Sequence, residues 1–372
     1  MNSVGKNITT VLLVLVAFTA GAPNLWSDLG PAHKKRQARP IKLGTSGGNV
    51  RDQTSQFCCS GTLGAVVQDS SGKRYVLSNN HVLGMNNKAK AGDLITQPGN
   101  IDVGCFPKDT DTVATFSRFV KINMGTKANN KVDASIAQVI TGKVNSTGFI
   151  LDIKSPGQPA EAQVGMRVKK SGRTTGTRKG EIEVINLTVN VQIPNQCGSS
   201  GGKVARFIDQ VGIADAPGGT APPFIAGGDS GSLLVKDVGN CPSTIGLLFA
   251  GDNVGNAAAN RIQNVLTALG QGMKMVGCAA AAGGVEDMNA LTMQHPSVIR
   301  AAAIQNRYQD ALLSIPGVVG VGIGMAKPGS RELALVVYTV KGTRAASAAN
   351  IVPERLDGMP VRKKITGEFV AF

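Results

Sequence analysis

The chain has 372 residues, a formal net charge of +15 at pH 7, 47 glycines and only 4% aromatic residues. This length allows two or three domains with a sizeable core, and many glycines among short Val/Ile/Leu runs favour a turn-rich β protein over a helical one. The basic residues are scattered and few aromatic side chains lie among them to stack bases, so we expect no nucleic-acid partner.

The N-terminal residues 1–22 have the layout of a secretory signal peptide. Lys6 lies in a short polar start, an apolar run covers 11–18, and small residues follow at 20–22. The run is short for a membrane span, so we expect no stable span after cleavage and a secreted or periplasmic location. Residues 23–45 form a basic leader, interpreted either as a propeptide with a processing site at Lys34-Lys35-Arg36 or as a disordered segment.

The chain contains six cysteines, and an even number in an exported chain predicts disulfides. They lack the paired CxxC clusters of a zinc site and histidine is scarce, so neither a metal nor another cofactor is expected. Adjacent cysteines cannot easily bridge each other, so each of the first two is expected to pair at a distance. The cysteines are Cys58, Cys59, Cys105, Cys197, Cys241 and Cys278.

From residue 61 the pattern predicts short strands separated by turns. The first two strands form a hairpin that ends directly at Asn79-Asn80-His81. Two runs of about six strands each, divided near residues 150–160, are followed by a helix over 259–269 that stops at Gly270. The predicted strands include 61–68, 73–78, 93–96, 112–116, 132–139, 167–170, 181–191, 204–208, 232–235 and 244–251.

The remaining chain reads as a linker over 279–290 and a small α+β domain over 291–372. A helix is expected over 296–313, and strands over 318–324, 333–340 and 368–370. Gly320-Val321-Gly322-Ile323-Gly324 lacks the helix opening that a dinucleotide phosphate needs. No catalytic cluster is evident in this domain, which could dock substrate, bind the cell envelope or cover a cleft as an inhibitor.

Three residues in the strand-rich part carry the chemistry of nucleophilic catalysis. Ser230 lies in the glycine-rich run 226–232, where a loop can expose a hydroxyl and aim amide groups into a small concavity. His81 is the only histidine of the strand-rich region. Asp133 lies in an apolar strand, where a buried carboxylate needs a partner such as an imidazole N–H. Asp111 is the rival carboxylate, but its polar loop predicts a solvated side chain.

The segments 78–83, 133–137 and 228–232 resemble, in this order, the three catalytic blocks of chymotrypsin/trypsin-like serine proteases, with bacterial trypsin-like peptidases most alike. The resemblance covers residues 45–278, and the protease domain is assigned to 46–278. It implies a mainly β fold, a chymotrypsin-like double β-barrel with a C-terminal helix, beside the small α+β domain. It also implies acyl transfer on a protein or peptide substrate.

The resemblance also implies the roles of single residues. Ser230 attacks the carbonyl, His81 moves the proton, Asp133 orients the imidazole, and the amides of Gly228 and Ser230 form an oxyanion hole. Substrate-binding residues are predicted in the strand that pairs with the substrate backbone and six positions before the serine, where Phe224 replaces the acidic residue of trypsins. These substrate-binding residues are Phe249, Ala250, Gly251 and Phe224.

Two features depart from this pattern. Asn79-Asn80 replaces the small residues usual before the histidine, and Ile41-Lys42-Leu43-Gly44 is not the start of a zymogen activated by a new N-terminus. The leading hypothesis is a secreted serine endopeptidase. The alternatives are a non-catalytic binding protein on a protease scaffold and an esterase that uses the same triad.

Overall fold

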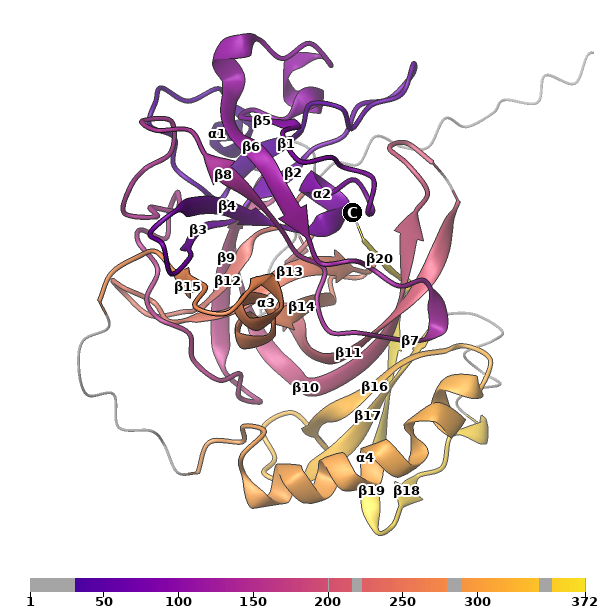
Figure 1. Ribbon diagram of the computed structural model, residues 1–372. Helices are drawn as coiled ribbons and strands as arrows, with labels where there is room; N and C mark the ends of the chain where they lie inside the picture. The colour runs from indigo at the N-terminus through magenta and orange to yellow at the C-terminus, as the bar shows by residue number, and fades with distance from the viewer. Residues whose placement is uncertain (1–30, 200, 216–222, 280–288, 341–349, 372) are drawn as a thin grey trace, which may run out of the picture.

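The computed structural model describes residues 31–199, 201–215, 223–279, 289–340 and 350–371. The predicted signal peptide and residues 280–288 of the predicted linker lie outside these residues. Two curled β-sheets lie beside each other, and the second continues into a helix-covered extension (Figure 1). Among the described residues, no helix is long and apolar enough to cross a membrane.

The first sheet closes into a barrel because one continuous stretch pairs on both of its edges. β2 and β3 are separated only by Gly64, and β2 pairs with β1 while β3 pairs with β4. The strand order is β2-β1-β5-β6-β8-β4-β3, with β15 added beyond β3. The strands are β1 (Thr45–Asn49), β2 (Gly61–Leu63), β3 (Ala65–Gln68), β4 (Arg74–Ser78), β5 (Leu94–Thr96), β6 (Thr112–Phe119), β8 (Ser135–Val139) and β15 (Lys274–Met275).

The second sheet closes in the order β10-β9-β12-β13-β14-β11, because β11 also pairs with β10. Its hairpin of β10 and β11 is unusually long and extends beyond the barrel, where β7 (Gly125–Asn130) runs parallel to β11. The barrel strands are β9 (Arg167–Gly172), β10 (Gly176–Pro194), β11 (Gly202–Asp215), β12 (Leu233–Lys236), β13 (Thr244–Gly251) and β14 (Ala257–Arg261).

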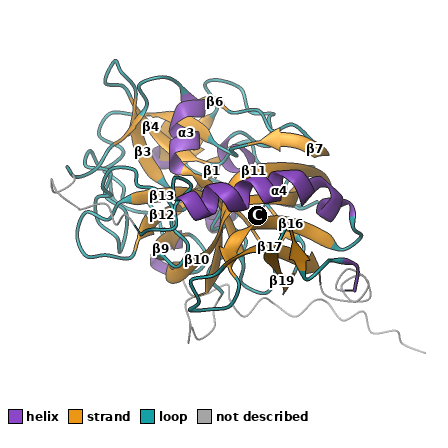
Figure 2. Ribbon diagram, turned by 90° about the horizontal axis from the view of Figure 1, so that it is seen from below, coloured by secondary structure: helices purple, strands orange, loops and turns teal. Residues whose placement is uncertain are grey.

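The C-terminal extension shares a sheet with the second barrel, since β16 pairs antiparallel with β10. Helix α4 (Pro296–Ser314) lies across β16 and β17 (Figure 2). Its buried side chains, at positions 298, 301, 305 and 312, follow helical spacing and face the sheet. The other elements are β16 (Val318–Met325), β17 (Leu333–Val340), β18 (Arg355–Leu356), β19 (Met359–Thr366) and β20 (Phe369–Val370).

The predicted helix over 259–269 is shorter than expected. Helix α3 covers Ile262–Leu269, and residues 257–261 form β14 instead. β14 pairs with β13 on one edge and with β11 on the other, so ladder hydrogen bonds outweigh the helical preference of its alanines. The predicted fold, a mainly β chymotrypsin-like double barrel with a C-terminal helix and a small α+β unit, is confirmed.

Residues 31–45 of the predicted leader pack against both barrels. Short helix α1 (Pro31–Lys34) buries His33, whose Nε2 lies 3.1 Å from the Ser171 hydroxyl. Ile41 and Leu43 are fully buried, and their amides donate to carbonyls of the connection between the barrels. This part of the leader therefore contributes to the core.

Three disulfides join the cysteines at a distance, as the adjacent pair requires. Cys58 bonds Cys105, Cys59 bonds Cys197, and Cys241 bonds Cys278. The second of these links the first barrel to the tip of the β10–β11 hairpin. The hairpin tip is also held by Asn86, whose side-chain amide donates to the Pro194 carbonyl at 2.7 Å.

Candidate active site

His81 and Asp133 lie at the ends of two paired strands in the first barrel. Short helix α2 (Asn80–Leu83) follows β4 and carries His81, while Asp133 comes just before β8. Nδ1 of His81 lies 2.5 Å from Oδ2 of Asp133. The histidine is 8% exposed and the aspartate is completely buried. The carboxylate therefore fixes the orientation of the ring.

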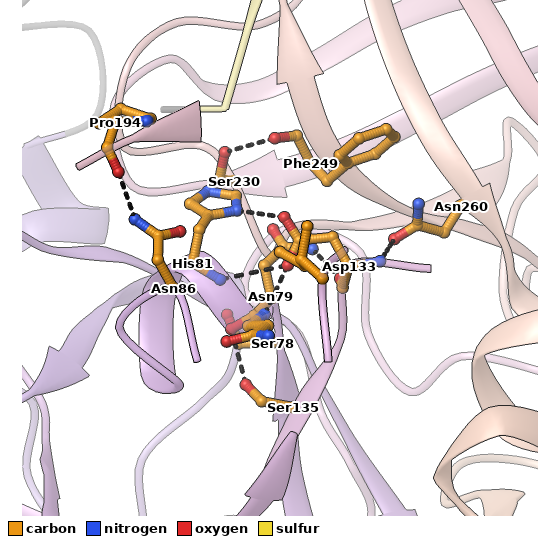
Figure 3. A network of polar contacts seen from close by, with 12 residues as sticks. Ser78, Asn79, His81, Asn86, Asp133, Ser135, Pro194, Ser230, Phe249 and Asn260 are labelled. Carbon is orange, nitrogen blue, oxygen red and sulfur yellow. Dashed lines mark hydrogen bonds and ion pairs between the residues drawn. The ribbon is translucent and has the colours of Figure 1, made fainter. Parts of the chain in front are cut away.

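The carboxylate and the backbone of Asp133 are held by several further bonds. Oδ1 accepts the amides of Asn80 at 2.6 Å and His81 at 3.2 Å. The carbonyl of Asp133 accepts the side-chain amide of Asn79 at 2.7 Å, and its backbone amide donates to Oδ1 of Asn260 at 2.9 Å. Figure 3 shows this network, in which the imidazole lies between Asp133 and Ser230.

The two asparagines that depart from the family pattern both have structural partners. Asn79 binds the Asp133 backbone as described, and its own carbonyl accepts the Ser135 hydroxyl at 2.6 Å. The side chain of Asn80 donates to Asn87 at 2.6 Å and to the Val120 carbonyl at 2.8 Å. These larger polar residues tie the histidine-bearing turn to Asp133 and to the neighbouring loops.

Asp111, the rival carboxylate, is buried rather than solvated, so that expectation was wrong. Arg36 donates to both of its oxygens, from Nε at 2.5 Å and from Nη2 at 2.8 Å. The amide of Lys108 adds a third bond at 2.9 Å. The Arg36 guanidinium holds the pKa of Asp111 below its usual value, although burial opposes this shift. The leader arginine explains why a carboxylate in a polar loop is buried.

Ser230 lies in a tight turn that packs against the first barrel. Its carbonyl accepts the Thr62 amide at 2.9 Å, and its hydroxyl donates to the Phe249 carbonyl at 3.3 Å. A Cβ placed on Gly61 would lie 2.6 Å from Val82 and 3.0 Å from the Ser230 carbonyl oxygen. The helix turn of His81 and the turn of Ser230 therefore flank the same glycine.

A buried ion pair between Lys170 of β9 and Asp229 holds the Ser230 turn in place. Nζ of Lys170 lies 3.0 Å from Oδ2 of Asp229, and both side chains are fully buried. The amides of Thr174 and Thr175 donate to the other oxygen, Oδ1, at 2.8 and 3.1 Å. Burial lowers the pKa of Lys170, which its interaction with Asp229 opposes. Lys170 therefore supplies the positive charge that pairs with Asp229. No N-terminal amine released by cleavage is needed for this role.

The turn leaves two amides available on either side of Asp229. Gly228 has a φ of +96°, a conformation that favours glycine, and a Cβ there would lie 2.7 Å from the Thr174 hydroxyl. Within the described residues, neither the Gly228 amide nor the Ser230 amide donates a hydrogen bond to the protein. Both residues are buried. Unsatisfied buried donors are rare unless a ligand uses them.

A cavity of about 470 Å³ opens beside His81 and Gly228. Its walls come from the loop over 51–60, the tip of the β10–β11 hairpin and the C-terminal residues Val370 and Ala371. The cavity lies between the two barrels, and the hairpin tip and the Cys59–Cys197 disulfide form part of its wall. Such a cleft suits an extended ligand that reaches both barrels.

Asp52 also lines this cavity and is partly buried. Burial raises the pKa of Asp52 to about 6, while the nearby His81 and Lys88 lower it to a smaller extent. The charge of the cavity wall therefore changes within the pH range where an imidazole also titrates.

None of the four predicted substrate-binding residues lines the cavity, and the side chains of Phe249 and Ala250 are fully buried in a core cluster. Phe249, Ala250 and Gly251 end β13, and the Phe249 carbonyl contacts Ser230 as described. Phe224 is fully buried in a core cluster with Ile182 and Ile213 and does not line the cavity. Residues 216–222, which precede Phe224, lie outside the described chain, so a role for Phe224 in specificity stays a prediction.

The sequence reasoning missed Lys170, Asn260 and Gln210. The side chain of Asn260 donates to Gln210 at 2.7 Å, which continues the chain of bonds behind Asp133. Asn260 follows three alanines in β14, so it is a polar residue in an apolar strand, the same signal that identified Asp133. Lys170 and Gln210 lie in strands that contain several other polar residues, so this signal does not single them out.

No protein-family model matches the chain. Among solved structures, it is similar to protease A of Thermobifida fusca (16% identity, covering 64% of this chain and 99% of that one, TM-score 0.40). It is also similar to a Nocardiopsis protease (14% identity, 63% and 98%, TM-score 0.40). A third is a glutamic acid-specific serine protease (18% identity, 63% and 100%, TM-score 0.41). These similarities are too distant to assign an activity, so the assignment depends on the site itself.

Proposed function

We propose that this chain is a serine endopeptidase that cleaves peptide bonds through an acyl-enzyme on Ser230. The observation that carries the proposal is the buried 2.5 Å contact between His81 and Asp133, at a cavity lined by His81 and by Gly227 and Gly228 of the Ser230 turn. An imidazole oriented by a buried carboxylate is the arrangement that activates a serine hydroxyl. The backbone amides of Gly228 and Ser230, which donate no hydrogen bond within the described residues, could bind the oxyanion that develops on the substrate.

In the acylation step, Oγ of Ser230 forms a bond to the carbonyl carbon of the substrate. The hydroxyl proton moves to Nε2 of His81, and Asp133 stabilises the resulting imidazolium through Nδ1–H. When the C–N bond breaks, His81 returns this proton to the leaving amine. In the second half, His81 takes a proton from water, the hydroxide attacks the ester, and Ser230 recovers its proton as the acid leaves.

The amides of Gly228 and Ser230 would bind the oxyanion of the tetrahedral intermediate. One such donor contributes on the order of 10²–10³ in rate. The Lys170–Asp229 pair keeps the turn that carries them in one conformation. The role of these residues is therefore electrostatic, and it requires a turn that is already ordered before substrate binds.

A peptide fits this site better than a simple ester because a strand edge adjoins the serine. β13 ends beside Ser230 and can pair with an extended backbone, whose main-chain hydrogen bonds supply affinity. An esterase would not need this edge. Hydrolysis of a peptide amide and of its matched ester by the same preparation separates these two activities.

The three disulfides favour an exported protein, because such bonds persist in oxidising compartments. Export through the predicted signal peptide belongs to the same proposal. Mass measurement of the N-terminus of the exported protein tests it, and a mature chain that still contains residues 1–22 would contradict it.

The test of the enzymatic proposal compares two serine variants. Ser230→Ala is expected to lower kcat for extended peptide substrates by about 10⁴-fold or more, because the nucleophile is lost. Ser199→Ala is the matched control, since Ser199 lines the same cavity without belonging to the proposed triad. Retained hydrolysis in Ser230→Ala would contradict the proposal. Absence of both hydrolysis and reaction with a serine-directed probe in every folded variant that keeps Ser230 would favour the non-catalytic binding protein.

A further inference from the structure

The C-terminal segment Gly367–Ala371 enters the cleft of the proposed active site. Val370 pairs antiparallel with Gly251 of β13, while Val370 and the preceding phenylalanine pair in parallel with β10. The Ala371 amide donates to the Gln192 carbonyl of β10 at 3.0 Å. Val370 and Ala371 line the same cavity as His81. Figure 1 shows β20 leading from the extension toward α2.

The register assigns β20 to one edge of β13. Gly251 has two strand partners, Ala257 of β14 and Val370 of β20. Because β14 occupies one edge of β13, β20 lies on the other edge. β12 pairs with that same edge, but at the beginning of β13, whereas β20 pairs at its end. The Ser230 turn comes directly before β12. β20 therefore lies where an extended substrate would pair beside the serine.

β20 runs antiparallel to β13, the direction expected of a substrate peptide that pairs with this strand. The pairing is antiparallel, so the chain after Val370 runs from Gly251 back toward Phe249. The Phe249 carbonyl is the group that accepts the Ser230 hydroxyl. The backbone of residues 370–371 thus approaches the nucleophile along β13, as the N-terminal side of a peptide substrate must do.

The segment is anchored at two points outside the cavity. The ring of Phe369 is 1% exposed and stacks on Tyr338 of β17, with ring centres 5.8 Å apart. The Gly367 amide donates to Oδ2 of Asp252 at 3.0 Å, and Asp252 is itself held by the amides of Val254 and Asn256. The C-terminal extension therefore contributes part of the surface that holds the segment.

We propose that residues 367–371 are an intramolecular peptide ligand of the substrate strand, and that extended peptides bind only when this segment is displaced. The inference rests on the proposed function in one respect, since it takes β13 as the strand that binds substrate. A tethered ligand acts at an effective concentration in the millimolar range, so it outcompetes weak peptides without extra contacts. A peptide that replaces it would place an aromatic side chain on Tyr338, followed by aliphatic and small residues.

A steric variant outside the cavity tests this proposal. A Cβ on Gly367 would lie 3.1 Å from Cβ of Asp252, the residue that accepts the Gly367 amide, so the branched side chain of Gly367→Val should push the segment away from this anchor. Gly239→Val is the matched control, because nothing lies within 4 Å of a Cβ there. Phe369→Ala, which removes the contact with Tyr338, is a second displacing variant if Gly367→Val does not fold.

The binding measurement is made with Ser230→Ala protein, which separates it from catalysis. The probe is a fluorescein-labelled peptide, Gly-Glu-Phe-Val-Ala-Phe, followed by anisotropy. The displacing variants are expected to bind it at least about tenfold more tightly than Ser230→Ala alone or with Gly239→Val, since the tethered competitor is gone. Equal affinity in all of these proteins would overturn the proposal.

The same variants with Ser230 intact distinguish the two proposals. Displacement should raise kcat/KM for extended peptides at least about tenfold. Equal hydrolysis with and without displacement would overturn the intramolecular ligand. Tighter peptide binding on displacement, with no hydrolysis by any variant, would uphold the ligand and overturn the proposed endopeptidase.

Discussion

The ammonium of Lys170 lies 3.0 Å from the carboxylate of Asp229, and neither side chain is exposed to solvent. Asp229 directly precedes the proposed nucleophile, so this ion pair fixes the turn from inside the second barrel. Lys170, the cation of this pair, lies in the middle of β9. The turn can therefore be ordered as soon as the barrel forms.

Replacing Lys170 should lower the free energy of unfolding, because it leaves the buried carboxylate of Asp229 without a partner. Lys170→Ala is expected to destabilise the fold by about 3–5 kcal/mol, because removing one partner of a buried pair leaves the other charge uncompensated. Urea unfolding measures this effect. The double variant Lys170→Met with Asp229→Asn should recover much of the loss, since it removes both charges. Lys169→Ala, at a more exposed pair with Asp237, is the control and should cost about 1 kcal/mol or less.

Asp133→Asn should reduce catalysis with little effect on substrate binding. The amide cannot stabilise the imidazolium and favours the wrong tautomer of His81, so kcat is expected to fall about 10³–10⁴-fold. Steady-state kinetics on a peptide substrate measure this, with KM as an internal control. A decrease of less than tenfold would mean that Asp133 does not orient the histidine.

Asp52 predicts a specific pH dependence of stability. Its folded-state pKa is raised to about 6 from the ordinary value of 3.8, so the protonated form is favoured in the folded protein. The stability from this preference is complete below 3.8 and is lost as the pH rises through about 6. Asp52→Asn should therefore stabilise the protein at pH 7–8 by up to about 3 kcal/mol, and not below pH 3.8.

Unfolding midpoints across this pH range check the prediction for Asp52. Asp93→Asn is the control with the opposite sign, because hydrogen bonds from Lys90, Arg51 and Asn49 outweigh burial and lower the pKa of Asp93. That variant should lose stability at neutral pH. A gain for Asp52→Asn that does not depend on pH would show that another effect dominates.

Arg36 in the leader should stabilise the folded double barrel. Arg36→Ala leaves the buried Asp111 without its guanidinium partner, at an expected cost of about 1–3 kcal/mol at neutral pH, because solvent reaches the exposed Arg36 side of the pair. The lowered pKa of Asp111 means that this stability is present above the ordinary value of 3.8 and is lost as the pH falls through the lower folded-state value. Lys35→Ala, at an exposed neighbour, is the control; equal stability of the two variants would contradict the account.

Much of the fold could be predicted from local sequence patterns. Short apolar runs between turn residues located most barrel strands, and the polar residue in the strand around Asp133 indicated a buried partner. The helix predicted over 259–269 is present but begins only at Ile262, because β14 has strand partners on both edges, which a local pattern does not reveal.

The contacts that complete the site join distant parts of the chain. Asn260 reaches the Asp133 backbone across 127 positions, and Arg36 reaches Asp111 across 75. The pairing of Val370 with Gly251 likewise depends on how the extension joins β10. Residue type, chain order and the family resemblance led to the proposed roles of His81, Asp133 and Ser230, whereas the residues that support them follow from the topology of the two barrels.

The central claim is that Ser230 is a nucleophile activated by His81. A fluorophosphonate probe followed by peptide mass mapping tests it most directly, in the full chain and in Gly367→Val. The account predicts a single adduct on Ser230, formed faster in Gly367→Val, lost in Ser230→Ala and His81→Ala, and retained in Ser199→Ala. An adduct on another serine, or no adduct in folded Gly367→Val, would contradict it.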